Sequence, residues 1–540
     1  MDVSERVGLD FVHRNGRSGR FRVPEILGAG AAFLDYDDDG DLDVFLVQGG
    51  ELEPPGDASG RSSTPRSGPG SDRLFRNDLV PGSVLRFEDV SARSGIRTRG
   101  YGQGVAVGDY DGDGWPDLYV TNFGPDQLLR NRGDGTFEDA SERAGAGGSS
   151  WSTSASFLDV DRDGRLDLYV ARYMDETLRA DRACVQPDGR HDYCSPLSFH
   201  PLPDRLLRNR GDGGFEDVSE RARILGALGN GLGVVAADFD GDGWPDIYVA
   251  DDQTENLLWL NQRDGTFRNA ALEAGVALSA DGTAEGSMGV DAGDFDDDGD
   301  EDLFFTNLMG QKNTLYVNDG QARFTDRSLT SGLGRLSQPG TGFGAAWLDY
   351  DNDGLLDVLL VNGTVLAVEA QRRAGDPLPY RQPAQLFRNL GNGQFREVSG
   401  EAGAALALPV VGRAAAFGDV DNAGDVDVLV TEIGGRARLL LNQVGSRHHW
   451  LGLRLLTGKR DALGATAVLR RPHGPSLWRR VHTDGSYGSA GDPRILFGLG
   501  DQAEAGPVEV LWPDARRERF RGLPVDKYTT LVEGGGEALP

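Results

Sequence analysis

The chain has 540 residues, and its 85 acidic against 55 basic side chains give a net charge of -30. Such an excess of negative charge repels a phosphate backbone, so nucleic acid is excluded as a partner. Apolar residues make up 38%, and no apolar run approaches the roughly 20 residues that a membrane helix needs, which excludes a transmembrane segment. The 78 glycines are about twice the usual share and indicate many turns between short strands.

One pattern recurs seven times: an apolar run, then Asp-x-Asp-x-Asp-Gly-x-x-Asp, then a second apolar run. A second signature follows each copy, Leu-x-x-Asn and usually Gly-x-Phe, as in residues 128–137. The segments between the signatures are short and rich in β-forming residues, so each unit predicts four short strands. The copies begin at Asp35, Asp109, Asp159, Asp238, Asp294, Asp349 and Asp419.

Seven four-stranded units predict a β-propeller, in which radial repetition leaves few exposed sheet edges. The seventh unit lacks the strand after its Leu-x-x-Asn, whereas residues 2–6 repeat residues 217–221 of an interior unit. We therefore expect residues 2–13 to form the outer strand of the seventh blade and to close the ring. The predicted fold is all-β: a seven-bladed β-propeller with calcium-binding Asp loops over residues 1–442, and a small β-sandwich-like domain over residues 443–540.

The C-terminal segment differs in charge from the rest of the chain. Residues 443–540 contain 14 Lys and Arg against 11 Asp and Glu, so this part is slightly basic while the repeats are strongly acidic. Its runs 450–455, 465–469 and 508–512 are β-like. We expect the basic module to dock on the acidic ring by electrostatic attraction.

The Asp loops have the residue pattern of calcium sites. Carboxylates at positions 1, 3, 5 and 9 of each loop converge on one side, and glycine at position 6 allows a sharp turn. The residues at position 7 of the seven loops have no side-chain chemistry in common, as expected when the backbone carbonyl at this position is the ligand. Oxygen-only ligands on a flexible loop favour Ca²⁺ over Mg²⁺.

Two alternatives to calcium binding fit the pattern less well. An EF-hand needs a bidentate Glu at position 12, which is instead apolar in every copy, for example Val120 and Phe305, so an EF-hand is excluded. Asp and Gly could also serve only to make turns, but seven copies of the same spacing argue against that. In the seventh loop position 5 is Ala423, so we expect six strong calcium sites and a seventh that is weak or empty.

The residues expected to hold calcium are those at positions 1, 3, 5, 7 and 9. They are Asp35, Asp37, Asp39, Asp41, Asp43, Asp109, Asp111, Asp113, Trp115, Asp117, Asp159, Asp161, Asp163, Arg165, Asp167, Asp238, Asp240, Asp242, Trp244, Asp246, Asp294, Asp296, Asp298, Asp300, Asp302, Asp349, Asp351, Asp353, Leu355, Asp357, Asp419, Asp421, Asp425 and Asp427.

Three insertions, at about residues 49–72, 172–204 and 362–384, fall between the second and third strands of their units. In a propeller such loops emerge opposite the first-to-second-strand loops, so partner recognition is expected opposite the calcium face. The second insertion contains both cysteines, Cys184 and Cys194. A disulfide between them fits an oxidising compartment, and two buried free thiols are the alternative.

Catalytic motifs are missing from the sequence: it has no Gly-x-Ser-x-Gly elbow, no Walker loop and no zinc-like histidine spacing. An enzyme would need a carboxylate or histidine in the central channel or on the insertions. The candidates are His191, His200, Asp251 and Asp252, acting on a carbohydrate or a natural product with Ca²⁺ as scaffold or Lewis acid. His448 and His449, at the junction, fit a polar linker better than a metal site.

The motifs resemble the FG-GAP (VCBS) repeats of integrin-α-type propellers, for example Gly-x-Gly-Val-Ala-x-x-Asp-x-Asp at residues 102–111. Over its whole length the chain is similar to the cartilage acidic protein family, with its C-terminal ASPIC-type domain. The supporting stretches are residues 9–16, 287–291, 460–464, 497–500 and 508–513. The resemblance implies an exported calcium-binding protein of adhesion or matrix type; bacterial relatives also occur beside natural-product genes.

These observations favour a binding or structural function over catalysis. We expect an exported, extracellular or periplasmic protein that acts as an adhesion or ligand-binding scaffold for an unidentified protein or glycan, and that is a monomer. The chain begins inside a repeat element, so an export signal was either removed or never present.

Overall fold

The computed structural model describes residues 1–52, 70–80, 84–177, 182–186, 189–471 and 474–539, and the statements below refer to them. The regular structure is almost all strand, as the sequence predicts. Helix occurs only as single turns: α1 (Ser4–Val7), α2 (Ser91–Ser94), α3 (Ser141–Ala144), α4 (Ala271–Ala274), α5 (Leu333–Ser337), α6 (Glu369–Arg373), α7 (Ala404–Ala407), η1 (Val23–Glu25), η2 (Pro196–Ser198), η3 (Ile224–Gly226) and η4 (Gly445–Arg447).

Seven antiparallel sheets, here called the repeat sheets, follow one another along the described part of the chain. Their short apolar strands end at Gly and Asp turns, so each sheet is a simple up-and-down meander. In chain order they are β1 (Ala31–Leu34), β2 (Asp43–Leu46), β3 (Arg73–Asn77) and β4 (Phe87–Asp89); β5 (Tyr101–Gly108), β6 (Asp117–Phe123), β7 (Gln127–Asn131) and β8 (Phe137–Asp139); β9 (Ser152–Leu158), β10 (Asp167–Arg172), β13 (Arg205–Asn209) and β14 (Phe215–Asp217); β15 (Gly231–Ala237), β16 (Asp246–Asp251), β17 (Leu257–Asn261) and β18 (Phe267–Asn269); β19 (Val290–Gly293), β20 (Asp302–Phe305), β21 (Thr314–Val317) and β22 (Thr325–Asp326); β23 (Gly342–Leu348), β24 (Asp357–Asn362), β25 (Gln385–Asn389) and β26 (Phe395–Glu397); and β27 (Gly412–Gly418), β28 (Asp427–Glu432) and β29 (Arg438–Leu440).

The first strands of the repeat sheets contact one another in a closed circuit. Strand β1 contacts β5, β5 contacts β9, and the series continues through β15, β19, β23 and β27, which returns to β1. Apolar side chains fill the space between neighbouring sheets, for example Phe33 and Val44 of the first sheet against Leu429 of the last. The arrangement is therefore propeller-like, with each first strand innermost.

The N-terminus lies against the last repeat sheet, but not as the strand that the sequence predicts for residues 2–13. Asp2 forms a bridge to Leu440 and Val12 one to Arg436, with α1 between them. The main-chain amide and the hydroxyl of Ser4 both donate to Asp2 Oδ1, and this bonding turns the chain into α1. The same turn follows β4, where Ser91 bonds to Asp89.

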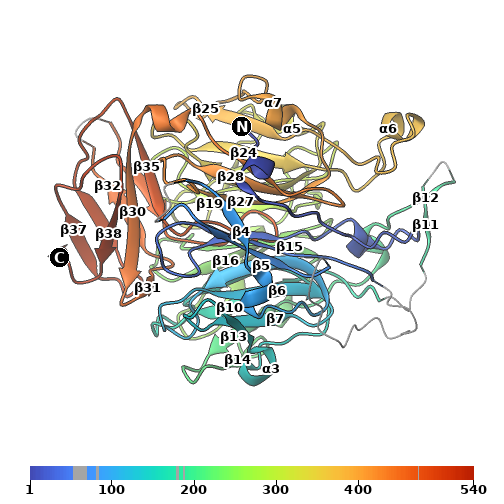
Figure 1. Cartoon of the computed structure of the whole chain (residues 1–540), viewed down its shortest axis with the longest axis horizontal. Helices are drawn as coiled ribbons and strands as arrows, with labels where there is room; N and C mark the ends of the chain where they lie inside the picture. The colour runs from blue at the N-terminus through green and yellow to red at the C-terminus, as the bar shows by residue number, and fades with distance from the viewer. Residues whose placement is uncertain (53–69, 81–83, 178–181, 187–188, 472–473, 540) are drawn as a thin grey trace.

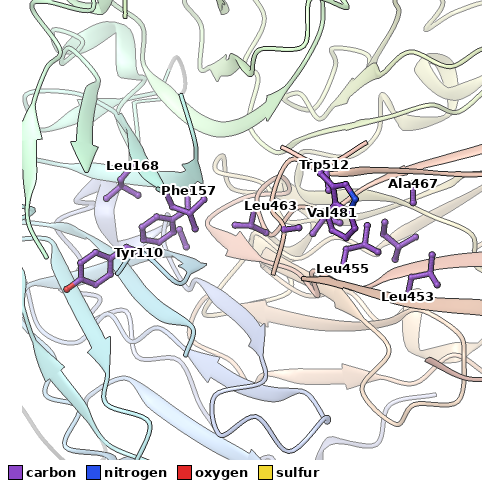
Figure 2. Packing of buried hydrophobic residues seen from close by; sticks show 14 of the residues in the cluster. Tyr110, Phe157, Leu168, Leu453, Leu455, Leu463, Ala467, Val481 and Trp512 are labelled. Atoms are coloured by element: carbon purple, nitrogen blue, oxygen red, sulfur yellow. The ribbon is translucent and has the colours of Figure 1, made fainter. Parts of the chain in front are cut away.

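Two further sheets form the C-terminal module. The first contains β31 (Arg460–Asp461), β30 (His449–Thr457), β35 (Ile495–Gly500) and β38 (Tyr528–Val532), and the second β33 (Leu477–Arg480), β32 (Thr466–Leu469), β36 (Val508–Leu511), β37 (Arg517–Phe520) and β39 (Glu537–Ala538). Buried Leu455, Val481 and Trp512 belong to a cluster that continues through Leu463 to Phe157 of the third repeat sheet (Figure 2). The module and the repeats therefore share one core.

The predicted insertions lie between second and third strands. The second contains β11 (Cys184–Val185) and β12 (His191–Asp192), and the third contains α6; of the first, residues 53–69 lie outside the described residues. Figure 1 shows β11, β12 and α6 at one end of the molecule and the C-terminal module at the other. Cys184 and Cys194 form a disulfide, which confirms the predicted bond.

Residues 483–492 of the C-terminal module, here called the central segment, lie inside the circuit of first strands. Strand β34 (Ser489–Ala490) pairs in parallel with β1. Val105 of β5 donates to the carbonyl of Gly488, Asp484 accepts from Ser156 of β9 and Ala236 of β15, and Val290 of β19 donates to Ser486 O. The Ser486 hydroxyl accepts from Ala345 of β23 and donates to Ala415 of β27. All seven first strands are bonded to this segment.

Candidate metal centre

Each Asp loop joins the first and second strands of a repeat sheet and has the same backbone conformation. Glycine at position 6 has a positive φ in every copy, between 83° and 102°, where a side chain would be strained. Position 4 is also left-handed in every copy, a feature that the sequence analysis did not identify. Its residues are Asp38, Gly112, Arg162, Gly241, Asp297, Asn352 and Asn422, and Asn, Asp and Gly tolerate this conformation best.

Main-chain amides hold the carboxylates at positions 1 and 9, as the second loop illustrates. Asp109 accepts from the amide of Asp113 at 3.1 Å and from that of Gly114 at 2.8 Å. Asp117 accepts from Tyr110 N at 3.1 Å and from Asn131 N at 2.7 Å. The second signature thus positions the last carboxylate of the first, which explains why the two recur together.

The predicted carboxylates come together within each loop. In at least five loops, one carboxylate oxygen from each of three residues lies within 4.8 Å of the others: Asp35, Asp37 and Asp39; Asp109, Asp111 and Asp117; Asp159, Asp161 and Asp167; Asp238, Asp240 and Asp246; Asp294, Asp296 and Asp302. Several ionised carboxylates this close repel one another unless a cation or protons lie between them.

Position 7 contributes its main chain to the loop, in keeping with its varied residue types. Its amide donates to the carboxylate at position 5, for example from Trp115 to Asp113 at 3.1 Å and from Leu355 to Asp353 at 3.0 Å. The side chains at position 7 go to different surroundings: the Trp115 ring faces Gly133, and Trp244 lies under Arg162.

The carboxylate at position 3 has one oxygen bound by arginine and one without a partner. Oδ2 of Asp111 accepts from Arg130, whereas its Oδ1 is buried and has no hydrogen-bond partner among the described residues. The same division holds for Asp161 with Arg208 and for Asp351 with Arg388. The arginine comes just before the Asn of Leu-x-x-Asn, and the sequence analysis did not assign it a role.

A buried anionic oxygen without a donor fits a bound cation. The donor set, several carboxylates and a main-chain position on a flexible loop, is one that suits Ca²⁺. The residues present therefore fit the ion that the Asp loops predict.

Burial is the main cause that raises the pKa of the loop carboxyls, and repulsion from neighbouring carboxylates adds to the rise. The pKa of Asp109 rises to about 6, and that of Asp294 to about 8. Hydrogen bonds from main-chain amides oppose the rise without cancelling it. A carboxyl of raised pKa binds a proton in the absence of metal, so protons and metal ions compete for these groups.

The seventh loop keeps the backbone of the others but is covered by the C-terminal module. Asp419 still accepts from the amides of Ala423 and Gly424. Its Oδ2 also accepts from the Tyr528 hydroxyl at 3.0 Å, and Arg494 donates to Asp419 O at 2.7 Å. This loop therefore lacks one carboxylate and has another engaged by the module.

The Asn of the second signature links neighbouring sheets, a role that the sequence analysis missed. Asn131 Nδ2 donates to Tyr36 O of the preceding Asp loop at 2.8 Å, and Asn209 donates likewise to Tyr110 O. The series closes where Asn77 donates to Val420 O of the seventh loop. Seven copies of this bond join the Asp loops into one ring.

The C-terminal module docks on the same face as the Asp loops, through ion pairs. Arg454 pairs with Asp35 and Asp38 of the first loop, and Arg471 pairs with Asp297 of the fifth. These contacts confirm the expected electrostatic docking of the basic module.

The residues considered for catalysis do not form one site. His191 and His200 are exposed, whereas Asp251 is fully buried and neither of its carboxylate oxygens has a partner among the described residues. Asp252 accepts from the Tyr173 hydroxyl at 2.7 Å. His448 and His449 are bonded to Asp351 O and Asp526, respectively, consistent with a polar junction.

No helix among the described residues is long and apolar enough to cross a membrane. The chain matches the FG-GAP-like repeat family over residues 35–120, 109–170, 187–249, 238–305 and 294–360. Residues 456–538 match the ASPIC and UnbV family.

Cartilage acidic protein 1 is a relative in several animals. The protein of Homo sapiens is 27% identical over 363 residues, which cover 62% of this chain and 50% of that protein. The protein of Xenopus tropicalis is 31% identical over 172 residues, which cover 31% of this chain and 26% of that protein. The chain thus spans about half the length, or less, of these relatives.

Two lectins are among the solved structures that match this chain. The BP39L lectin of Burkholderia pseudomallei has a TM-score of 0.43 at 13% identity, over 76% of this chain and 95% of that one. An Agrocybe aegerita lectin that recognises non-reducing terminal N-acetylglucosamine has a TM-score of 0.38 at 16% identity. The match covers 69% of this chain and 90% of that lectin. From the repeat matches, the chain belongs to the FG-GAP-like repeat proteins, and it is a homologue of the cartilage acidic proteins.

Proposed function

We propose that the chain is an exported seven-bladed β-propeller, over residues 1–442, that calcium stabilises and that serves as an adhesion or ligand-binding scaffold. Residues 443–540 are a separate module in sequence that completes the propeller in three dimensions. The N-terminal residues supply the missing outer element of the seventh blade, since Asp2 and Val12 bridge to the segment that contains β29.

The observation that carries the calcium proposal is the unpartnered position-3 oxygen, repeated at Asp111, Asp161 and Asp351. A single unpartnered oxygen would be a local feature of one loop. Its recurrence in loops that share left-handed residues at positions 4 and 6, with a second oxygen held by arginine, points to a common ligand. When bound, Ca²⁺ neutralises the converging carboxylates and lowers their mutual repulsion. The chain's own arginines and main-chain amides keep those carboxylates in place.

The partner surface in this proposal is the end of the molecule opposite the Asp loops. The second and third insertions meet there: Asp192 accepts from the Tyr380 hydroxyl at 2.9 Å and from Ala367 N at 3.1 Å. Tyr193 packs against Phe21 and Tyr380, next to the disulfide. The insertions thus form a supported platform, and it exposes Leu197 and Leu366, apolar side chains of the kind that protein interfaces cover.

Calcium titration calorimetry on two matched variants tests the calcium sites. Asp111→Asn and Asp421→Asn change the same position in the second and the seventh loop. We expect Asp111→Asn to remove one of the strong sites and to lower the melting temperature in calcium. We expect Asp421→Asn to leave the number of strong sites unchanged, because its loop has Ala423 and is engaged by Tyr528. Equal losses in both variants would contradict the assignment of six strong sites and one weak site.

A further inference from the structure

The C-terminal module contacts the seven Asp loops unequally. In the second and fourth loops position 4 is glycine, Gly112 and Gly241, and no hydrogen bond or ion pair joins these loops to the described part of the module. In each of the other five loops the side chain at position 4 is bonded to the module. These residues are Asp38, Arg162, Asp297, Asn352 and Asn422. Position 4 is therefore a docking position for the module.

The sixth loop, residues 349–357, is held most firmly, because its main chain is bonded to the module at three positions. The bonded pairs are Asp351 O with His448 Nδ1 at 2.6 Å, Asn352 O with Gly500 N at 2.8 Å, and Gly354 O with Arg479 Nη2 at 3.3 Å. Within the described residues, no other Asp loop has three main-chain carbonyls bound by the module.

Side-chain packing encloses the same part of the sixth loop. Asn352 is fully buried, and its Nδ2 donates to Gly445 O of the module at 3.0 Å. Gly498 of the module lies so close that a β-carbon there would be 2.1 Å from Asp349 Oδ2. In the second loop, by contrast, Gly112 is exposed, and a β-carbon added to it would have no atom within 4 Å. Position 4 is thus enclosed in the sixth loop and open in the second.

These two loops offer a calcium ion the same side chains. Both have Asp at positions 1, 3, 5 and 9. Oδ1 of the position-3 residue, Asp111 or Asp351, is buried and has no partner among the described residues, and Asp351 as a whole is only 7% exposed. The position-5 side chains are equally exposed, Asp113 at 29% and Asp353 at 28%. The loops therefore differ in how their backbone is held and not in their ligands.

This difference affects how an ion leaves. An ion enclosed by several carboxylates and a main-chain oxygen is released when the loop opens locally and water replaces its ligands. The second loop opens without disturbing the module. The sixth loop opens only after its bonds to the module break. By linkage, an ion in the sixth loop also stabilises the docked module.

We propose that the C-terminal module retains the calcium ion of the sixth loop, which is released only when the module detaches from that loop, whereas the ion of the second loop exchanges directly with solvent. The inference rests on the proposed calcium function and adds a regulation to it. The sixth ion is then the one that couples calcium binding to the docking of the module.

Rapid mixing of the calcium-loaded full chain with a fluorescent calcium chelator tests the proposal. We expect a slow phase of about one ion, released at least tenfold more slowly than the fast ions. Asp351→Asn should remove this slow phase. The matched variant Asp111→Asn, the same change in the second loop, should remove one fast ion and keep the slow phase.

A third variant, Asn352→Gly, gives the sixth loop the glycine of the second loop and leaves its ligands in place. The slow phase should become at least threefold faster with its amplitude kept, and hydrogen exchange of the Gly500 amide should accelerate with it. If this variant fails to fold, the two Asp variants still decide.

The amplitudes and the rates answer separate questions. Release of the full calcium count in one phase, or a slow phase that persists in Asp351→Asn, would overturn this inference and leave the proposed calcium function intact. Release of no calcium at all would refute the proposed function and this inference together.

Discussion

The carboxylates of the Asp loops are held by short-range bonds that recur in every copy. At position 9, Asp117 accepts from two main-chain amides, and Asp246 does the same from Phe239 and Asn261. These bonds fix the carboxylates in a partly desolvated place, so their ionised form depends on a nearby positive charge.

This dependence predicts how pH affects the calcium-free protein. Burial raises the pKa of Asp246 to about 8 and that of Asp109 to about 6, above the value of 3.8 expected for an unfolded chain. The stabilisation from their bound protons is complete below pH 4 and is lost as the pH rises through 6 to 8. We expect the melting temperature of calcium-stripped protein to fall between pH 5 and pH 8. With saturating calcium that fall should disappear, because the ion replaces the protons. A calcium-free melting temperature that rises over this range would contradict the account.

Repetition in the sequence was sufficient to predict most of the loop residues. Seven copies of one spacing predicted the converging carboxylates and the glycine turn, because local chemistry alone dictates both. The roles of Asn131 and Arg130 were missed because their partners lie on another loop or another strand, although both residues belong to the second signature. The second signature recurs as regularly as the Asp pattern. Its Asn and Arg residues could therefore have been considered as contacts of the Asp loops in the same way.

At the scale of elements, the sequence placed the insertions correctly but not the shape of the N-terminus. The repeat of residues 217–221 at residues 2–6 predicted an outer strand over residues 2–13, whereas Ser4 bonds to Asp2 and starts the turn of α1, as Ser219 bonds to Asp217 in the interior copy. The local side-chain bond to the main chain prevailed over the strand pattern. The disulfide was predictable, since the second insertion has little apolar surface and both cysteines lie near its neck.

The disulfide should order the platform more than it stabilises the whole chain. In the loop-entropy view, a bond that closes a loop this short contributes about 3 kcal/mol. In Cys184→Ser with Cys194→Ser, we expect faster amide hydrogen exchange around Tyr193 and faster proteolysis of the second insertion, with a small change in the global melting temperature. Mass spectrometry of the unreduced protein should find no alkylatable thiol. Two alkylatable thiols, or unchanged exchange in the double variant, would contradict this view.

At the scale of the whole molecule, the central segment makes the module part of the propeller. Asp484, Ser486 and Gly488 are bonded to first strands around the circuit, and Tyr487 is buried against Phe343. No repeat pattern marks residues 483–492, so sequence analysis could not predict that they fill the centre. The repeats and the C-terminal module are separate in sequence, but each depends on the other in the folded structure.

This dependence predicts one unfolding transition for the whole chain. Scanning calorimetry in calcium should show a single cooperative peak, because unfolding of the module removes hydrogen bonds from all seven first strands. Replacing Gly488 by Val should lower that peak, since Gly488 has a φ of 55° and lies against Gly104 of β5. Two well-separated peaks, with the first confined to the module, would show that the propeller does not need the central segment.

The calcium content of the purified chain tests the central claim most directly. Elemental analysis after dialysis against a buffer with low micromolar free calcium should find about six calcium ions per chain, and removal of the ions should lower the melting temperature by many degrees. The six are the loops that keep a carboxylate at position 5, and the seventh should fill only at higher calcium. A chain that contains no calcium after this dialysis and melts at the same temperature with and without a chelator would contradict the account.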